Sequence, residues 1–177
     1  MRKVFLYICM SLDGYLATND DGLDWLSVVE KEGEDYGYAD FTTNIDTYIV
    51  GRKTYAKVVD MVGSFDHTKN YDCYVLTRQD IPNEGHVTFY NGDIVELIEN
   101  IRKKEGKHIY CDGGAEVVKL LMDNDLIDEY IISVIPTILG DGKRLFKGGT
   151  ESRKIKLVSE KKYDTGLLQL HYKRDRT

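Results

Sequence analysis

The segment spanning residues 107–136 constrains the fold more than any other, because two strand patterns there enclose a glycine pair and a helix pattern. Residues 108–111 predict a short buried strand, and the glycine pair 113–114 follows as a sharp turn. Helical spacing of apolar residues then predicts a helix over 115–123, and the apolar run 130–135 predicts a second strand. The segment is therefore a βαβ unit. Its glycine pair is either a tight turn or a place where the backbone approaches a phosphate at a helix N-terminus.

A second unit of the same form lies earlier in the chain. Residues 47–50 predict a strand, Gly51 is the turn, and Arg52, Lys53 and Thr54 open a helix. The two cations and the hydroxyl are groups that hold phosphate. This second unit favours a ligand-binding role for both glycine turns.

A third predicted strand, residues 72–76, ends at Thr77 and Arg78 and repeats this chemistry. Residues 4–10 are apolar on both faces of a strand, which predicts a central position in the sheet. In an open α/β sheet, ligands bind outside the carboxyl ends of the strands. The three strand ends therefore predict a site for a phosphate-bearing ligand at one edge of the sheet.

The composition bounds the class of protein. A chain of 177 residues is most simply one domain, residues 1–177, with a sizeable core. The net charge of −6 argues against a broad surface for nucleic acid, although it allows a local basic pocket for a small anionic cofactor. No apolar run reaches the roughly 20 residues of a membrane-spanning helix.

The cysteines and histidines give no sign of disulfides or metal. Cys9, Cys73 and Cys111 lie in predicted strands, and their odd number without CxxC spacing predicts reduced thiols in a cytoplasmic protein. The four histidines have no spacing typical of metal ligands, so no metal site is expected.

Two further segments bear on a substrate. Residues 13–25 predict a surface loop, which is either a lid over a bound ligand or an ordinary connection. Residues 28–44 predict a charged helix that Gly33 and Gly37 interrupt. Asp35 lies on this segment, and its carboxylate either faces a substrate or belongs to a solvated helix face.

Four motifs follow one another along the chain: Ser11–Ala17, Ile49–Tyr55, Asp112–Ala115 and Leu139–Phe146. With them the chain resembles the dihydrofolate reductase-like superfamily, and within it the stand-alone relatives of the reductase domain of the bifunctional riboflavin-biosynthesis deaminase-reductase. The resemblance implies a three-layer α/β/α fold, whose mostly parallel central sheet has about eight strands and an antiparallel C-terminal strand. It also implies NADPH as hydride donor and a homodimer that uses the C-terminal strands and the loop 137–150.

The resemblance also implies the cofactor contacts. It implies that the pyrophosphate and 2′-phosphate bind at Gly51, Arg52, Lys53 and Thr54, and that Thr77 and Arg78 also hold the 2′-phosphate. It implies that the nicotinamide and diphosphate lie beside Gly113 and Gly114, with Ala115, Glu116 and Val117 opening the helix that follows. It implies that Leu16 and Ala17 contact the nicotinamide ribose. The residue chemistry agrees, because guanidinium groups bind a phosphate dianion bidentately. Two arginines there favour NADPH, whereas an NADH enzyme more often has a carboxylate at this place.

The pattern of the deaminase half is missing, since the chain has neither His-x-Glu nor Pro-Cys-x-x-Cys. Two carboxylates, Asp13 and Asp35, are candidates for the group that donates a proton or binds the substrate. The first hypothesis is an NADPH-dependent reductase of a small heterocyclic substrate, either pterin- or folate-like or ribosylaminopyrimidine-like. The alternative is a non-catalytic nucleotide-binding module that retains the cofactor cleft.

Overall fold

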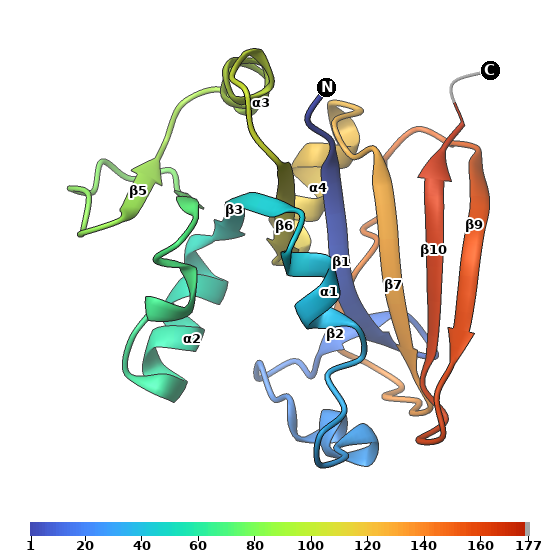
Figure 1. The fold of residues 1–177 in the computed structure, drawn as a ribbon. Coiled ribbons are helices and arrows are strands. Elements are labelled where there is room, and N and C mark those ends of the chain that lie inside the picture. The colour runs from blue at the N-terminus through green and yellow to red at the C-terminus, as the bar shows by residue number, and fades with distance from the viewer. Residues whose placement is uncertain (176–177) are drawn as a thin grey trace.

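The computed structural model describes residues 1–175 and is built around one eight-stranded sheet with the order β5-β4-β3-β6-β1-β7-β10-β9 (Figure 1). The strands of this sheet are β1 (Val4–Ser11), β3 (Ile45–Gly51), β4 (Asp72–Leu76), β5 (Val87–Tyr90), β6 (His108–Gly113), β7 (Glu129–Ile135), β9 (Ile155–Lys162) and β10 (Leu168–Arg174). The six strands from β5 to β7 pair in parallel, and β10 pairs antiparallel with both β7 and β9. The predicted sheet, with its antiparallel C-terminal strand, is confirmed.

The apolar first strand occupies the centre, as predicted, with β6 on one side and β7 on the other. Its alternate side chains enter different core clusters. Val4 and Leu6 pack toward one face of the sheet, and Tyr7 packs toward the other. A strand that is buried on both faces has no solvated side, which explains its apolar sequence.

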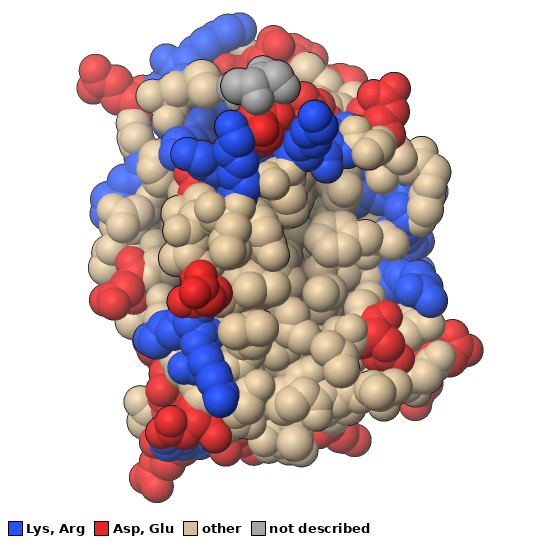
Figure 2. All heavy atoms as spheres, turned by 90° about the vertical axis from the view of Figure 1, so that its right-hand side faces the viewer, with Lys and Arg blue, Asp and Glu red and all other residues tan. Residues whose placement is uncertain are grey.

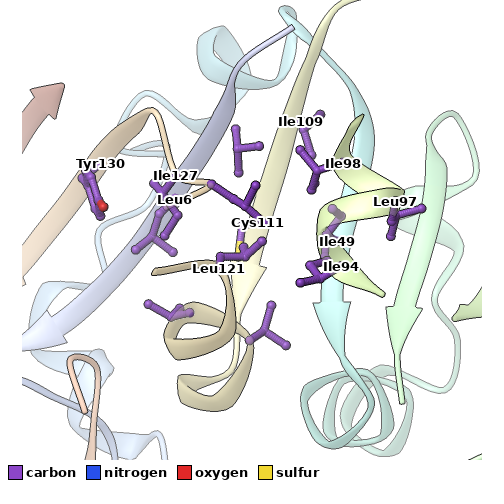
Figure 3. Packing of buried hydrophobic residues seen from close by; sticks show 14 of the residues in the cluster. Leu6, Ile49, Ile94, Leu97, Ile98, Ile109, Cys111, Leu121, Ile127 and Tyr130 are labelled. Carbon is purple, nitrogen blue, oxygen red and sulfur yellow. The ribbon is translucent and has the colours of Figure 1, made fainter. Parts of the chain in front are cut away.

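Helices cover both faces of the sheet and complete three layers. Their bounds are η1 (Asp24–Val29), α1 (Tyr38–Thr42), α2 (Arg52–Val62), η2 (Asp66–Thr68), α3 (Ile94–Lys103) and α4 (Ala115–Asp123). Helices α3 and α4 pack into the main core cluster on one face (Figure 3), whereas α1 and α2 pack on the other face. In that main cluster, Ile98 of α3 and Leu121 of α4 have no exposed surface.

The helix predicted over residues 28–44 is wrong. The segment instead forms the 3₁₀ helix η1, then turns, and then the five-residue helix α1. The backbone φ angle is positive at Gly33, Tyr36 and Gly37, which a right-handed helix does not allow. The two glycines that interrupt the predicted helix therefore mark turns between two short helices.

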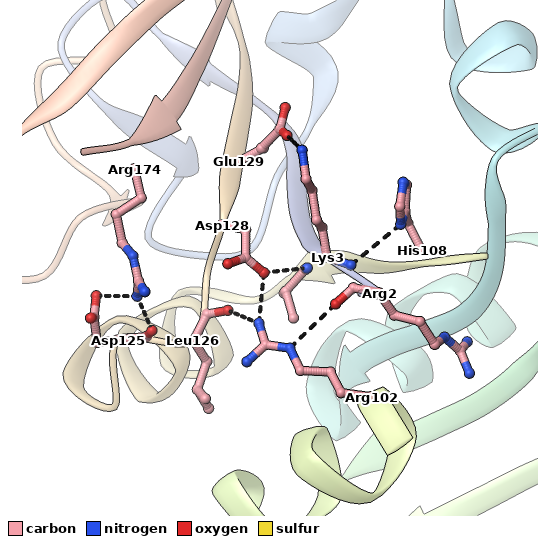
Figure 4. Close-up of polar contacts among 10 residues, drawn as sticks. Arg2, Lys3, Arg102, His108, Asp125, Leu126, Asp128, Glu129 and Arg174 are labelled. Atoms are coloured by element: carbon pink, nitrogen blue, oxygen red, sulfur yellow. Dashed lines mark hydrogen bonds and ion pairs between the residues drawn. The ribbon is translucent and has the colours of Figure 1, made fainter. Parts of the chain in front are cut away.

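The amino-terminal edge of the sheet is tied together by ion pairs and hydrogen bonds (Figure 4). Arg102 Nη2 donates to Asp128 Oδ2 at 2.6 Å, and the same oxygen accepts the backbone N–H of Val4 at 2.9 Å. Lys3 pairs with Glu129 at the start of β7. These contacts fix the starts of β1 and β7 and so hold the opposite, carboxyl edge in register.

A small second sheet lies beside the carboxyl edge, where β2 (Tyr15–Ala17) pairs antiparallel with β8 (Lys143–Arg144). The region predicted as the loop 13–25 therefore contains a short strand. No helix among residues 1–175 is both long and apolar enough to cross a membrane.

Candidate cofactor and substrate site

Three strand ends meet at the carboxyl edge, and they carry most of the predicted cofactor residues. In the paired strands Val50 lies opposite Gly113, and Gly51 lies opposite Leu76, the residue before Thr77. The ends of β3, β4 and β6 are therefore neighbours. The predicted convergence of these three strand ends is confirmed.

The glycines at this edge line a cradle that has no room for a side chain. A Cβ atom on Gly51 would lie 3.0 Å from Val117 Cγ2, and a Cβ atom on Gly114 would lie 3.0 Å from Thr54 Oγ1. A Cβ atom on Gly113 would lie only 2.6 Å from the side chain of Ile8. Gly113 and Gly114 also have φ angles of +95° and +79°, which favour glycine. The two glycine turns thus contact each other through Thr54 and Val117.

Both helices that start at this edge begin without a side-chain cap. Gly51 is the N-cap of α2 and Gly114 is the N-cap of α4. The first backbone N–H groups of a helix lack partners within the helix, and they carry a partial positive charge that attracts anions. Ala115 is the first residue of α4, so the predicted start of this helix is confirmed.

Glu116, in the first turn of α4, pairs with one lysine and is influenced by the charges of two further cations. Lys147, on the segment after β8, makes an ion pair with Glu116. The hydrogen bond from Lys147 lowers the pKa of the Glu116 carboxyl, and the charges of Lys147, Arg78 and Lys53 lower it further against an opposing effect of burial. Arg52 is exposed at the first position of α2. The basic residues of this edge therefore gather near the start of α4.

Leu16 and Ala17, the predicted lid residues, lie on β2. Leu16 packs against the main core cluster, which includes Val117. Ala17 is buried, and the β2–β8 pairing is so close that a Cβ atom on Gly142 would lie 2.3 Å from the Ala17 carbonyl oxygen. The small sheet therefore places this segment against the core.

Asp13 and Asp35, the two predicted acids, both accept hydrogen bonds that favour the ionised form. Asp13 accepts the Ser11 hydroxyl at 2.5 Å and the backbone N–H groups of Leu139 and Gly140, and the Ser11 bond is the main reason that its pKa is lowered. Asp35 accepts two backbone N–H groups at the start of α1, at 2.9 Å each, and these bonds lower its pKa. Each carboxylate holds a loop in place, and neither is poised to donate a proton.

A third carboxyl group, Asp112, was missed by sequence reasoning. It lies directly before the glycine pair, and its side chain points to the face that α1 and α2 cover. The Tyr110 hydroxyl donates to its Oδ1 atom at 2.6 Å, and the Tyr48 hydroxyl donates to Oδ2. Burial raises the pKa of Asp112, although the two tyrosine hydroxyls oppose this effect. The residue as a whole is half-buried, and its carboxyl group lies beside the glycine pair.

Aromatic residues surround this carboxyl group. The Tyr38 ring on α1 lies 6.2 Å from the Tyr110 ring, and the Tyr7 ring packs edge-on to both. Burial, followed by the charge of Asp112, raises the pKa of Tyr38 to about 12. Cys9 lies on the same side of β1, and burial raises its pKa to about 11, so this thiol is protonated near neutral pH.

The three-layer α/β/α architecture and the order of its strands define a dihydrofolate reductase-like fold. The family model of the RibD C-terminal domain matches residues 2–169. The chain therefore belongs to the RibD C-terminal domain family.

Relatives of known sequence or structure agree with this membership. YwjB, an uncharacterised protein of Bacillus subtilis strain 168, is 41% identical over 174 residues that cover 98% of each chain. A crystal structure from Shewanella sp. PV-4, provisionally described as a riboflavin biosynthesis protein, is 28% identical, covers 98% of this chain and 99% of its own, and gives a TM-score of 0.88. A Thermotoga maritima deaminase and 5-amino-6-(5-phosphoribosylamino)uracil reductase has the same fold, with a TM-score of 0.75 at 18% identity, and this chain covers 57% of its length.

Proposed function

We propose that this protein is an NADPH-dependent reductase of a small heterocyclic substrate of the ribosylaminopyrimidine type. One observation carries the proposal: two uncapped helix N-termini and two glycine turns meet in a cradle beside a basic cluster. Membership of the RibD C-terminal domain family supports the reductase class.

The residues present fit NADPH. Because Gly51 and Gly114 have no Cβ atom, their backbone can approach a diphosphate closely. The N-termini of α2 and α4, which start at these glycines, attract the negative charge of the diphosphate. Arg78 and Arg52 supply bidentate donors for a 2′-phosphate. The bound cofactor would supply a hydride, and the protein would orient it and exclude water.

We assign the proton donor to Asp112 rather than to Asp13 or Asp35. A hydride added to an unsaturated group leaves negative charge on the adjacent heteroatom, and a nearby acid neutralises it. The raised pKa of Asp112 suits a donor, while the lowered pKa values of the other two carboxyls do not. Replacing each aspartate by asparagine tests this assignment: D112N should lower turnover by about 10²- to 10⁴-fold with NADPH affinity retained. Turnover that survives in D112N but is lost in D13N or D35N would contradict it.

The aromatic surroundings of Asp112 suit a flat heterocyclic ring. The exposed Tyr38 ring offers an aromatic surface near the carboxyl group, and aromatic rings favour offset or edge-on stacking. The Tyr110 and Tyr48 hydroxyls occupy the two oxygens of Asp112, so these three side chains form one hydrogen-bonded cluster beside the aromatic rings. The substrate class therefore rests on the residues as well as on the family.

The first test of function is NADPH binding and oxidation. Purified protein is titrated with NADPH and then assayed with ribosylaminopyrimidine and dihydrofolate compounds. In the variant R52Q/R78Q, NADPH affinity should fall much more than NADH affinity, whereas K57Q, on the exposed face of α2, should change neither. Equal losses for both cofactors in R52Q/R78Q would contradict the 2′-phosphate assignment. Tight binding without turnover of any compound would favour the non-catalytic module instead.

We also propose a homodimer that forms through β9 and β10. Strand β9 is exposed along its whole length at the edge of the sheet, and Ile155, Leu157 and Val158 are each more than 40% exposed. Figure 2 shows a broad uncharged area on the side of the molecule where these strands lie. Exposed apolar side chains on an edge strand form a surface that proteins usually cover. L157E should give a monomer in light scattering. S159E should not, because the register shift between β9 and β10 puts Ser159, opposite His171, on the other face from Leu157, opposite Tyr172. A wild-type monomer at micromolar concentration would refute the proposal.

A further inference from the structure

We propose that Lys147 is a further cofactor-binding residue, which Glu116 holds beside the cradle until the cofactor diphosphate takes the place of the Glu116 carboxylate. This inference rests on the proposed function, because it concerns the same cofactor site. It adds a residue from a part of the chain that no glycine motif contains.

The ion pair joins two separate parts of the molecule. Lys147 follows β8 and the fully buried Leu145, so its segment is anchored to the core only two residues away. Glu116 lies in the first turn of α4, on the far side of the glycine pair from β6. The pair therefore brings the small β2–β8 sheet to the start of α4, where the diphosphate is expected.

The charges at this point are arranged for a stronger anion than one carboxylate. Lys147, Arg78 and Lys53 come from three separate segments of the chain, the loop after β8, the loop after β4 and helix α2, and the charges of all three lower the pKa of the Glu116 carboxyl. Glu116 is the only carboxyl that contacts Lys147 in an ion pair among the described residues. Three cations around one carboxylate leave a net positive charge, which a diphosphate neutralises better.

The ion pair is also weak enough to exchange partners. The Glu116 side chain is 70% exposed and the Lys147 side chain is 39% exposed. Exposed ion pairs contribute little to stability, because solvent and salt screen them. A phosphate at an uncapped helix N-terminus gains from the backbone N–H groups as well as from the lysine. Lys147 therefore passes from Glu116 to the phosphate, and Glu116 turns to solvent.

The test is a double-mutant series with NADPH affinity as the readout, measured by calorimetry. K147A should weaken NADPH binding about tenfold, the loss of one charged hydrogen bond. E116Q should tighten binding several-fold, because it removes an anion beside the phosphate. K147A should also weaken binding about tenfold in the E116Q background. Lys143 provides a matched control, since its side chain is also 39% exposed and pairs with Asp21, and K143A should leave the affinity unchanged.

Two results would overturn the inference without affecting the proposed function. If wild-type protein binds NADPH and K147A binds it equally well, Lys147 has no role. If K147A weakens binding only while Glu116 is present, the lysine merely neutralises the carboxylate and does not contact phosphate. A wild-type protein that binds no NADPH overturns the proposed function, and this inference with it. Thermal unfolding of each variant excludes a folding defect as the cause.

Discussion

Replacement of Gly114 by alanine tests whether the glycine pair is a phosphate cradle or only a turn. Gly114 has a φ angle of +79° and a ψ angle of 127°, a conformation that L-residues rarely adopt. Such strain lowers the free energy of unfolding by about 1–3 kcal/mol. An alanine also reduces the conformational entropy of the unfolded chain, which raises the free energy of unfolding by about 0.4–1 kcal/mol. We expect a net loss of about 1–2 kcal/mol, or a fall in Tm of about 2–8 °C for a chain of this size.

The alanine methyl group has a second effect, which concerns the ligand. It would lie 3.0 Å from Thr54 Oγ1, inside the space that lies between the two glycine turns. We expect the methyl group to keep the diphosphate from the N-terminus of α4 and to weaken NADPH binding at least tenfold. Gly140 gives the control: its φ angle is +78°, but a Cβ atom there would meet nothing within 4 Å. G140A should therefore lose some stability, because of its positive φ angle, with unchanged NADPH affinity.

Denaturant unfolding and calorimetric titration of both variants decide the matter. If G114A loses stability as G140A does but binds NADPH as tightly as wild type, the glycine pair is only a turn. If G114A keeps full stability, the backbone argument fails as well.

Three further predictions concern stability. D93A should lower the free energy of unfolding by about 1 kcal/mol, because Asp93 caps α3 by accepting the Glu96 backbone N–H at 2.9 Å. Urea unfolding measures this loss, and an unchanged midpoint would refute the role of Asp93 as a cap. I98A should cost about 2–5 kcal/mol because Ile98 is fully buried, and a loss under 1 kcal/mol in the same assay would mean that the core collapses around the site. Burial raises the pKa of Asp112, so the folded state binds this proton more tightly than the unfolded state, and stability falls as pH rises from the usual carboxyl pKa through the raised one. The stability of D112N relative to wild type should therefore improve as pH rises through that window, and a constant difference from pH 4 to 8 would contradict the raised pKa.

The spacing of apolar residues was enough to predict those helices and strands that are specified by their own residues. Helix α4 runs over Ala115–Asp123 as predicted, because Val117, Val118 and Leu121 form one buried face at helical spacing. The helix predicted over residues 28–44 is wrong because the backbone turns with positive φ angles at Gly33, Tyr36 and Gly37.

The part of the site that consists of short sequence motifs was predicted from the sequence. Gly51, Thr54, Gly113 and Gly114 follow from turn and phosphate chemistry, and the structure brings them together. The cofactor that they hold stays a prediction.

The polar groups around Asp112 could not be predicted in this way. Tyr48 and Tyr110 meet this carboxyl because β3 and β6 pair with Tyr48 opposite Tyr110, a register that joins residues 62 positions apart. The only available signal was the aspartate itself, placed between a buried strand and the glycine pair. The Lys147–Glu116 pair depends on a similar long-range approach, between the segment after β8 and α4.

Titration of the wild-type protein with NADPH and NADH, followed by calorimetry at one salt concentration, tests the central claim most directly. We expect saturable binding of one NADPH per chain, at least tenfold tighter than NADH, because two arginines are available for the 2′-phosphate. Equal affinity for the two cofactors would remove the arginine argument. Binding of neither would show that the glycine cradle and its helix N-termini serve the fold alone.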